Sequence, residues 1–173
     1  MKLDDFLANH VMTSPQQRWF LHFTDQSNLD SIKKHGILSA SEIRRLNIKA
    51  RFGGNKWSID RDIASGMDAY VHLCFKSDHP MEKGAVEGGT IEKLVRVKID
   101  PEIIKLPGVL ITDDVSNKIG VNAAPAVDML DHLDLDVLYK RMQWKGEVLK
   151  RLKLAEKCEI LVPKQVPPRF ILE

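Results

Sequence analysis

The sequence predicts an α+β fold in which short helices and short strands follow one another in an irregular order. Two segments, residues 18–23 and 70–75, have the length and the apolar, aromatic-rich content of buried strands. Serines that suit helix N-caps and glycines that suit helix ends mark short helices in the same region. The elements lack the regular alternation of β-α-β units, which argues against a doubly wound sheet.

The first expected element is an amphipathic helix over residues 3–12, whose apolar side chains fall on one side. The strand at 18–23 follows it. Ser27 suits the N-cap of a helix over residues 28–35, and Gly36 is placed to end that helix.

Another short helix is expected to start at Ser39 or Ser41 and to end near residue 46. Residues 51–63 are polar and include two adjacent glycines, which predicts a loop with one helical turn at most. The strand at 70–75 places Tyr70, His72 and Cys74 on one face, because side chains alternate along a strand. Residues 81–90 contain three glycines and are expected to form a surface loop or lid.

The second half of the chain is predicted to add several short elements. A helix begins at Pro101, residues 126–142 are partly helical, and residues 146–157 form an amphipathic helix. The remaining apolar segments predict strands at 94–99, 109–112, 159–162 and 170–172.

Length and composition indicate the number of domains, the class of protein and its location. The chain has 173 residues and a mass of 19.7 kDa, which suits a single domain over residues 1–173. Its 43% hydrophobic and 29% charged residues are typical of a globular protein. No apolar segment reaches the roughly 18–20 residues of a membrane span, and the first residues do not resemble a secretory signal. With only two cysteines, far apart, a cytoplasmic location is expected.

Charge is distributed unevenly along the chain. The net charge is +2, yet residues 18–61 hold nine Lys or Arg against four Asp or Glu, a net +5. Residues 143–173 hold seven against four, a net +3, and residues 100–136 hold two against eight, a net −6. This pattern suits a polarised surface whose basic face attracts phosphates or nucleic acid. The alternative is that the three segments interleave in space and cancel.

The common catalytic motifs, such as GxGxxG, Walker A, HExxH and GxSxG, do not occur in this sequence. Two placements remain of interest. His22 and Thr24 alternate at the end of the first strand, and Asn28 opens the next helix, an arrangement that suits an anionic or sugar-bearing ligand or a satisfied core histidine. Glu159 begins an apolar strand, where its carboxylate faces either solvent or a cleft. The histidines show no metal-ligand spacing, and no metal site is predicted.

Five segments, taken in order, resemble the DarT family, bacterial toxins that ADP-ribosylate DNA. FLHFTDQSNL at 20–29 is similar to the family pattern Y-H-[IF]-T-x-x-x-N-L, and SIKKHGIL at 31–38 continues it. IKAR at 48–51 resembles the basic I-K-x-R segment, and DAYVHLCFKSDHPM at 68–81 resembles D-Y-V-P-x-Y-F…P-M. AEKCEILVPKQV at 155–166 resembles the segment that carries the family's glutamate. His72 stands where proline is usual, Cys74 where tyrosine is common, and Asp25 where histidine is frequent.

The resemblance implies an ADP-ribosyltransferase fold, a split and mostly antiparallel β-sandwich with short flanking helices, which binds NAD as co-substrate in the cleft between the sheet halves. Glu159 would be the catalytic carboxylate that stabilises positive charge on the ribose. Arg51 would neutralise a phosphate. The residues implied to contact NAD are His22, Thr24, Asn28, Asn55 and Tyr70.

The acceptor implied by the resemblance is a base in single-stranded DNA, because a duplex hides the ring nitrogens. The residues expected to contact the strand are Arg44, Lys49, Trp57 and Arg61, with Arg51 and Arg61 as alternatives for the functional arginine. A toxin or phage-defence role and a macrodomain antitoxin as partner are also implied. Two alternatives remain open: the same fold with an RNA, protein or small-molecule acceptor, and a non-catalytic module that binds NAD or nucleic acid.

Overall fold

The computed structural model describes residues 1–172, and its centre is an antiparallel sheet of seven strands. The spatial order of the strands is β6-β5-β7-β3-β1-β4-β9. This arrangement confirms the predicted α+β class. The strands of the sheet are β1 (Phe20–Asp25), β3 (Tyr70–Cys74), β4 (Leu94–Ile99), β5 (Leu110–Thr112), β6 (Ala123–Pro125), β7 (Glu159–Pro163) and β9 (Ile171–Leu172).

A second sheet of two strands pairs β2 (Ile37–Leu38) with β8 (Gln165–Val166). The single residue Lys164, with a positive φ of 65°, separates β8 from β7. The chain therefore leaves the large sheet at the end of β7 and enters the small one at once, which divides the strands as a split fold requires.

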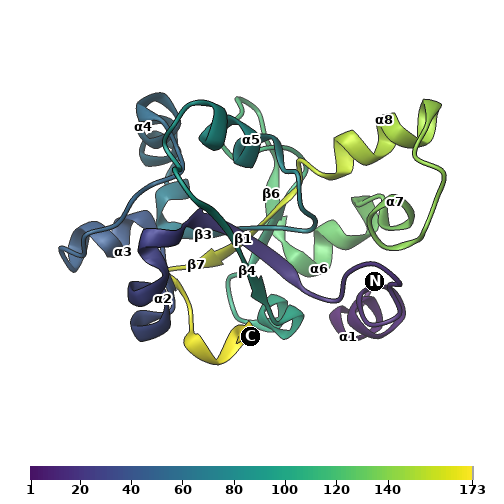
Figure 1. Ribbon diagram of the computed structural model, residues 1–173. Helices are drawn as coiled ribbons and strands as arrows, with labels where there is room; N and C mark the ends of the chain where they lie inside the picture. The colour runs from purple at the N-terminus through teal and green to yellow at the C-terminus, as the bar shows by residue number, and fades with distance from the viewer. Residues whose placement is uncertain (173) are drawn as a thin grey trace.

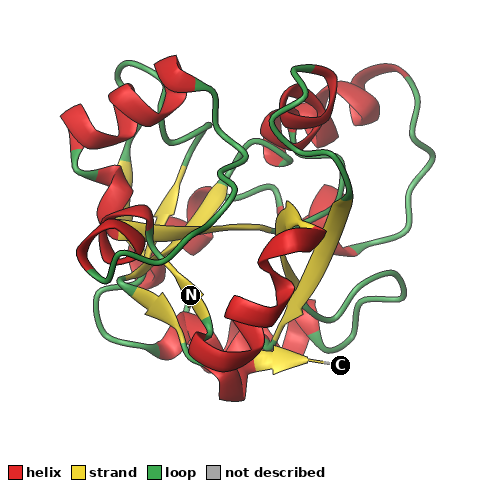
Figure 2. Cartoon of the chain, turned by 60° about the vertical axis from the view of Figure 1, so that its left-hand side comes forward, coloured by secondary structure: helices red, strands yellow, loops and turns green. Residues whose placement is uncertain are grey.

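Short helices surround the strands at both ends of the large sheet (Figures 1 and 2). Helices α2, α3 and α4 lie together at one end, and α7 and α8 lie at the other (Figure 1). The α-helices are α1 (Leu3–Phe6), α2 (Leu29–His35), α3 (Ala40–Arg45), α4 (Lys56–Ser65), α5 (Pro80–Glu87), α6 (Ala126–Met129), α7 (Leu135–Tyr139) and α8 (Gly146–Ala155). A π-helical turn covers Leu7–Val11, and 3-10 helices cover Gln26–Asn28, Met67–Ala69, Pro101–Lys105, Leu130–His132 and Pro168–Phe170.

The core lies between the sheet and these helices. Its largest fully buried side chains come from the central strands and from the segments that pack on them, such as Phe20, Leu73 and Ile160. Phe20 and Phe75 contact each other edge to face, with ring centroids 5.7 Å apart. The apolar segments that predicted the strands therefore place their side chains in the core, as expected.

Two predicted loops are helices instead. Residues 51–63 were expected to be a loop, but α4 begins after Asn55, whose side chain accepts a hydrogen bond from the Ser58 N–H at 2.9 Å. Gly66 ends this helix in the left-handed conformation. Residues 81–90 were expected to be a loop or lid, but α5 begins at Pro80, after His79 accepts a hydrogen bond from the Met81 N–H. Both N-caps outweigh the helix-breaking effect of the nearby glycines.

Smaller corrections concern strand positions. The first strand runs over Phe20–Asp25 rather than 18–23, so it extends two residues further toward Asn28. Strands β6 and β8 were not predicted, because each has only two or three residues and depends on a partner strand.

The large sheet is split between β1 and β3. These neighbours share one register pair, Leu21 with Cys74, whereas β1 pairs with β4 at six positions and β3 pairs with β7 at five. Beyond Leu21 the two strands separate, and side chains instead of main-chain hydrogen bonds occupy the space between them. This separation positions the site described below.

Gly36 fixes the approach of α2 to the small sheet, and its replacement by alanine should be destabilising. Its φ is +74°, and an added Cβ would lie 2.2 Å from the Val166 carbonyl oxygen. We expect Gly36→Ala to lower the free energy of unfolding by at least about 2 kcal/mol, a fall in Tm of roughly 4–8 °C, measured by thermal denaturation. Gly66→Ala is the comparison, since its φ of +75° is similar and no atom lies within 4 Å of the added Cβ, although its ψ is 7° where that of Gly36 is −172°. Equal losses in both variants would contradict a role for the Val166 contact.

Candidate active site

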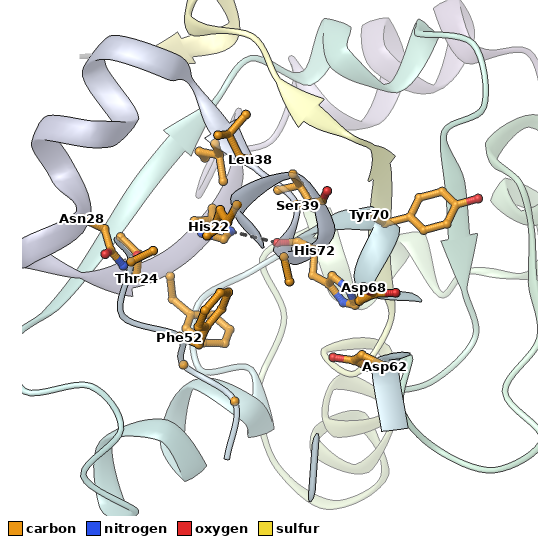
Figure 3. Close-up of a pocket in the computed structure, with 18 of the residues that line it drawn as sticks. His22, Thr24, Asn28, Leu38, Ser39, Phe52, Asp62, Asp68, Tyr70 and His72 are labelled. Carbon is orange, nitrogen blue, oxygen red and sulfur yellow. Dashed lines mark hydrogen bonds between the residues drawn. The ribbon is translucent and has the colours of Figure 1, made fainter. Parts of the chain in front are cut away.

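A pocket lies where β1 and β3 separate, and Figure 3 shows the side chains that line it. Its walls come from segments far apart in the sequence. They include β1, the α2–β2 turn, α3, residues 48–54, α4, β3 and the loop at 115–117, together with the first residue of β7. The polar lining residues used below are His22, Thr24, Asn28, Arg51, Asp62, Tyr70, His72, Ser116 and Glu159.

His22 bridges the split. Its Nδ1 lies 3.0 Å from the His72 carbonyl oxygen, and the dashed line in Figure 3 marks this contact. A carbonyl oxygen only accepts, so Nδ1 carries the proton and Nε2 retains a free lone pair. Burial lowers the pKa of His22 to about 4, an effect that the bond to His72 offsets only in part. The ring is therefore neutral at pH 7 and can accept a hydrogen bond from a ligand hydroxyl.

Asn28 connects the end of β1 with the segment that contains Arg51. Its Nδ2 donates to Thr24 Oγ1 at 2.9 Å and to the Arg51 carbonyl at 2.8 Å, while its Oδ1 accepts from the Arg51 N–H at 2.9 Å. The Thr24 hydroxyl oxygen thus already accepts, which leaves its proton available to a ligand. The three bonds position one wall of the pocket against another.

Arg51 lies at the pocket edge, 35% exposed. Its Nε donates to the Thr90 carbonyl at 2.7 Å, and its Nη1 lies 2.7 Å from Glu92 Oε1. The guanidinium is held in place by these partners while part of it remains accessible, which suits a fixed positive charge beside the pocket.

Glu159 is almost fully buried at the floor of the pocket, with 5% of its side chain exposed. Its position follows from β7, where it lies opposite Cys74 in the ladder with β3. Glu159 Oε2 accepts a hydrogen bond from the Ser116 N–H at 2.7 Å. Oε1 has no hydrogen bond among the described residues and is therefore free to accept one from a ligand.

Two histidines flank this carboxylate. His72 Nδ1 lies 3.7 Å from Glu159 Oε2, and His79 Nε2 lies 3.8 Å from Oε1. Burial opposes ionisation of Glu159, but the His72 contact and charge outweigh it, with help from His79 and Ser116, and lower the pKa of Glu159. The carboxylate is therefore charged at neutral pH despite its burial.

The face that α4 presents to the pocket carries Ser58, Ile59 and Asp62, which follow helical spacing. Burial raises the pKa of Asp62, and its Oδ1 is buried without a hydrogen-bond partner. Trp57 and Arg61 occupy the neighbouring face and do not line the pocket. The helix thus explains which polar side chains of this segment reach the site.

Comparison with known proteins identifies the family. A family model described as "ssDNA thymidine ADP-ribosyltransferase, DarT" matches residues 21–173. The chain belongs to the DarT family. Membership confirms the predicted family and the enzyme class, and the family description agrees with the predicted transfer to a base of single-stranded DNA.

Solved DarT structures show the same fold. Thermus sp. 2.9 DarT in complex with ADP-ribosylated ssDNA aligns with a TM-score of 0.68 at 19% identity, covering 92% of this chain and 81% of that one. The same protein in complex with NAD+ aligns with a TM-score of 0.62. Thermosipho africanus DarTG in complex with ADP-ribose aligns with a TM-score of 0.67 at 23% identity, covering 88% of this chain but 42% of that one. No curated protein matches the chain.

Six residues that the sequence suggested for a DarT site lie together in the pocket: Glu159, Arg51, His22, Thr24, Asn28 and Tyr70. Figure 3 shows Tyr70 on the side of the pocket away from Thr24 and Asn28. Five others do not line the pocket: Asn55, Arg44, Lys49, Trp57 and Arg61.

The five outlying residues have other surroundings. Asn55 caps α4, and Arg44 forms an ion pair with Asp68, itself a pocket residue. Lys49 is exposed between pocket residues 48 and 50, and Trp57 is 62% exposed. Arg61 has a buried Nε without a hydrogen-bond partner.

Sequence reasoning missed Ser116 and Asp62 and treated His72 mainly as a departure from the DarT pattern. The signal for Asp62 was present, because the Asn55 N-cap and Gly66 bound a helix that places Ser58 and Asp62 on one face. No sequence pattern indicates Ser116, which lies 43 residues before Glu159 and meets it only through the fold.

Metal-binding clusters and membrane-spanning helices do not occur in the part of the chain that the structure describes. Within residues 1–172, no three His, Cys, Asp or Glu side chains lie together in a way that could hold a metal ion. None of the helices in that range is both long and apolar enough to cross a bilayer.

Proposed function

We propose that this chain transfers ADP-ribose from NAD to thymidine in single-stranded DNA, with Glu159 as the catalytic carboxylate. The observation that carries the proposal is a buried, ionised carboxylate at the floor of a pocket in a DarT-family fold, with Oε1 free to accept a hydrogen bond. The similar Thermus DarT structure is a complex with ADP-ribosylated ssDNA, which supports the same acceptor.

The pocket residues fit NAD as co-substrate. Neutral His22 offers an acceptor at Nε2 and Thr24 offers a hydroxyl proton, both of which suit ribose hydroxyls. Apolar side chains such as Ile43 and Phe52 line the same pocket and suit the flat faces of the rings. Tyr70 is proposed to stack on nicotinamide, and Arg51 to pair with a phosphate.

Glu159 contributes to the reaction in two ways. NAD supplies the ADP-ribosyl group, and the bond between ribose C1″ and the nicotinamide nitrogen breaks with its electrons leaving on nicotinamide. Glu159 binds a ribose hydroxyl through Oε1 and stabilises the positive charge that develops on the sugar. It then accepts the proton that the thymidine ring nitrogen loses as that nitrogen bonds to C1″.

The acceptor strand is proposed to pass over the outer face of α4 and the preceding basic segment. Trp57 and Arg61 are separated by one helical turn there, and Lys49 and Arg44 lie in the preceding segment. An exposed tryptophan near positive charge is a typical platform for an unpaired base. Asn55 supports this face by capping the helix, and its predicted contact with NAD stays a prediction.

Removal of the Trp57 ring should weaken binding of the acceptor. Stacking contributes about 1–3 kcal/mol per base, so we expect Trp57→Ala to raise KM for single-stranded DNA by roughly 10-fold with KM for NAD unchanged. Leu154→Ala on α8 is a matched control, because Leu154 is equally exposed at 62%. An unchanged KM for DNA in Trp57→Ala would place the strand elsewhere.

The proposal extends to biological context. The similar Thermosipho protein is a DarTG, which fits a toxin paired with an antitoxin, and a macrodomain protein that removes ADP-ribose is the proposed partner. A cytoplasmic location and one domain over residues 1–173 are parts of the same proposal.

One assay tests the function. Purified chain is incubated with NAD labelled in the ADP-ribose part and, separately, with single-stranded DNA pools with and without thymidine, total RNA, or lysate protein. Label on the thymidine-containing pool alone supports the proposal. Label on RNA or protein instead would move the chain to another acceptor class, and no label on any acceptor would indicate a non-catalytic binding module.

A further inference from the structure

The surroundings of Glu159 include a histidine that the mechanism above does not use. His72 Nε2 lies 3.1 Å from the Met67 carbonyl oxygen, so Nε2 carries a proton and the ring orientation is set. On its other side, Nδ1 lies 3.0 Å from Ser116 Oγ and 3.7 Å from Glu159 Oε2. Since the Ser116 N–H donates to the same Oε2, the three residues form a closed group of contacts.

Of the two histidines beside Glu159, His72 is the one placed to carry a positive charge. His79 Nδ1 accepts from the Met81 N–H, so that nitrogen is unprotonated, and Nε2 faces the Lys157 carbonyl. His72 Nδ1 has no such fixed donor. It meets a hydroxyl, which can either donate or accept, and two carboxylates act on it.

The other ionisable groups near His72 and Glu159 either favour protonation of His72 or are uncharged. Asp62 on α4 adds a negative charge that favours protonation of His72. Neutral His22 lies across the split, with Nδ1 on the His72 carbonyl. The thiols of Cys74 and Cys158 are buried, and burial raises the pKa of both, so they stay uncharged. Within residues 1–172, the groups that lower the pKa of Glu159 belong to His72, His79 and Ser116, and of the two histidines His72 is the one placed to be protonated.

We propose that His72, together with Ser116, holds the Glu159 carboxylate ionised and oriented for the transfer reaction, as a positioning residue that sets the lower pH limit of activity. The inference rests on the proposed role of Glu159.

The direction of the effect follows from the charges. Burial opposes the charged forms of both residues, but their mutual contact outweighs it, so the pKa of His72 is raised and the pKa of Glu159 is lowered. With His72 protonated, Glu159 stays ionised well below pH 5. Without His72, the burial penalty on Glu159 loses its main compensation, and protonation of the carboxylate moves to higher pH.

The test compares His72→Gln with the unmodified chain from pH 5 to pH 9. We expect the kcat of the unmodified chain to be flat between pH 5 and pH 7, because the pKa of Glu159 is lowered to about 2. In the variant we expect the acid limb to move up by about four pH units, to about pH 6, because burial of the carboxylate is no longer compensated. At pH 5 this predicts a loss of roughly 10-fold or more beyond the loss at pH 8. His132→Gln, an exposed histidine, is the control and should keep the unmodified profile.

A direct titration separates this inference from the proposed function. Carbon-13 NMR of the Glu159 carboxyl, assigned through Glu159→Gln, should show a higher pKa in His72→Gln than in the unmodified chain. Ser116→Ala removes the hydroxyl and keeps the main-chain N–H, so it should move the titration in the same direction by a smaller amount. It also serves as the second variant if His72→Gln does not fold.

The pH profile and the carboxyl titration distinguish failure of this inference from failure of the proposed function. An unchanged carboxyl titration, or a rate loss that is equal at every pH, would overturn the inference and leave His72 with a packing role. If the unmodified chain modifies no acceptor, the proposed function fails, whereas the titration still reports whether His72 lowers the pKa of Glu159.

Discussion

Replacement of Glu159 by glutamine is expected to lower the rate of ADP-ribose transfer to single-stranded DNA by at least about 1,000-fold, while NAD binding changes only a few-fold. Removing one preorganised electrostatic contact typically costs 100- to 1,000-fold, and loss of a general base adds to this. Glutamine has the same shape, and its amide oxygen can still accept from the Ser116 N–H. The variant therefore removes the charge and leaves the pocket intact.

Single-turnover assays with labelled NAD and a thymidine-containing oligonucleotide measure this rate, and calorimetry measures the affinity for NAD. Glu147→Gln on α8 is a suitable control, because Glu147 is exposed and does not line the pocket. A Glu159→Gln variant that keeps more than a tenth of the rate would mean that the carboxylate is not catalytic.

Asn28→Ala is expected to lower kcat/KM for NAD by about 100-fold, mainly through KM. The variant loses three hydrogen bonds, one to Thr24 and two to the Arg51 main chain. At about 1 kcal/mol each, these bonds account for roughly 3 kcal/mol. Without them the segment that carries Arg51 is no longer held against β1, and the Thr24 hydroxyl loses its fixed orientation.

Initial rates at varied NAD concentration give both constants, and circular dichroism checks that the fold persists. Asn9→Ala is the control, since Asn9 is exposed and its side chain forms no hydrogen bond within residues 1–172. An unchanged KM for NAD in Asn28→Ala would show that Asn28 does not shape the NAD site.

The strands were more predictable than the helices, because strand β3 and the start of β7 are short apolar segments bounded by polar residues. Helix α4 was missed because its interior is polar, with a lysine, two aspartates and an arginine, so periodicity gives a weak signal there. Its caps, Asn55 and Gly66, carried the information instead. The short strands β6 and β8 have no local signal, since pairing alone defines them.

Those site residues that belong to a local sequence pattern could be predicted. His22, Thr24 and Asn28 lie within one strand and turn, so their proximity follows from local geometry. Glu159 was recognised through the family resemblance, since a glutamate at the start of a strand is usually exposed. Its contacts with His72, His79 and Ser116 depend on three distant segments that converge, which no spacing in the sequence encodes.

The split between β1 and β3 has a consequence for how the molecule responds to its ligand. One half of the sheet, β6-β5-β7-β3, meets the other, β1-β4-β9, through a single register pair and the bond from the His22 ring to His72. A ligand that contacts His22 and Thr24 on one side and Glu159 on the other links the two halves of the sheet by additional contacts. Part of its binding free energy then resists separation of the halves, so tighter binding and greater rigidity of the sheet rise together.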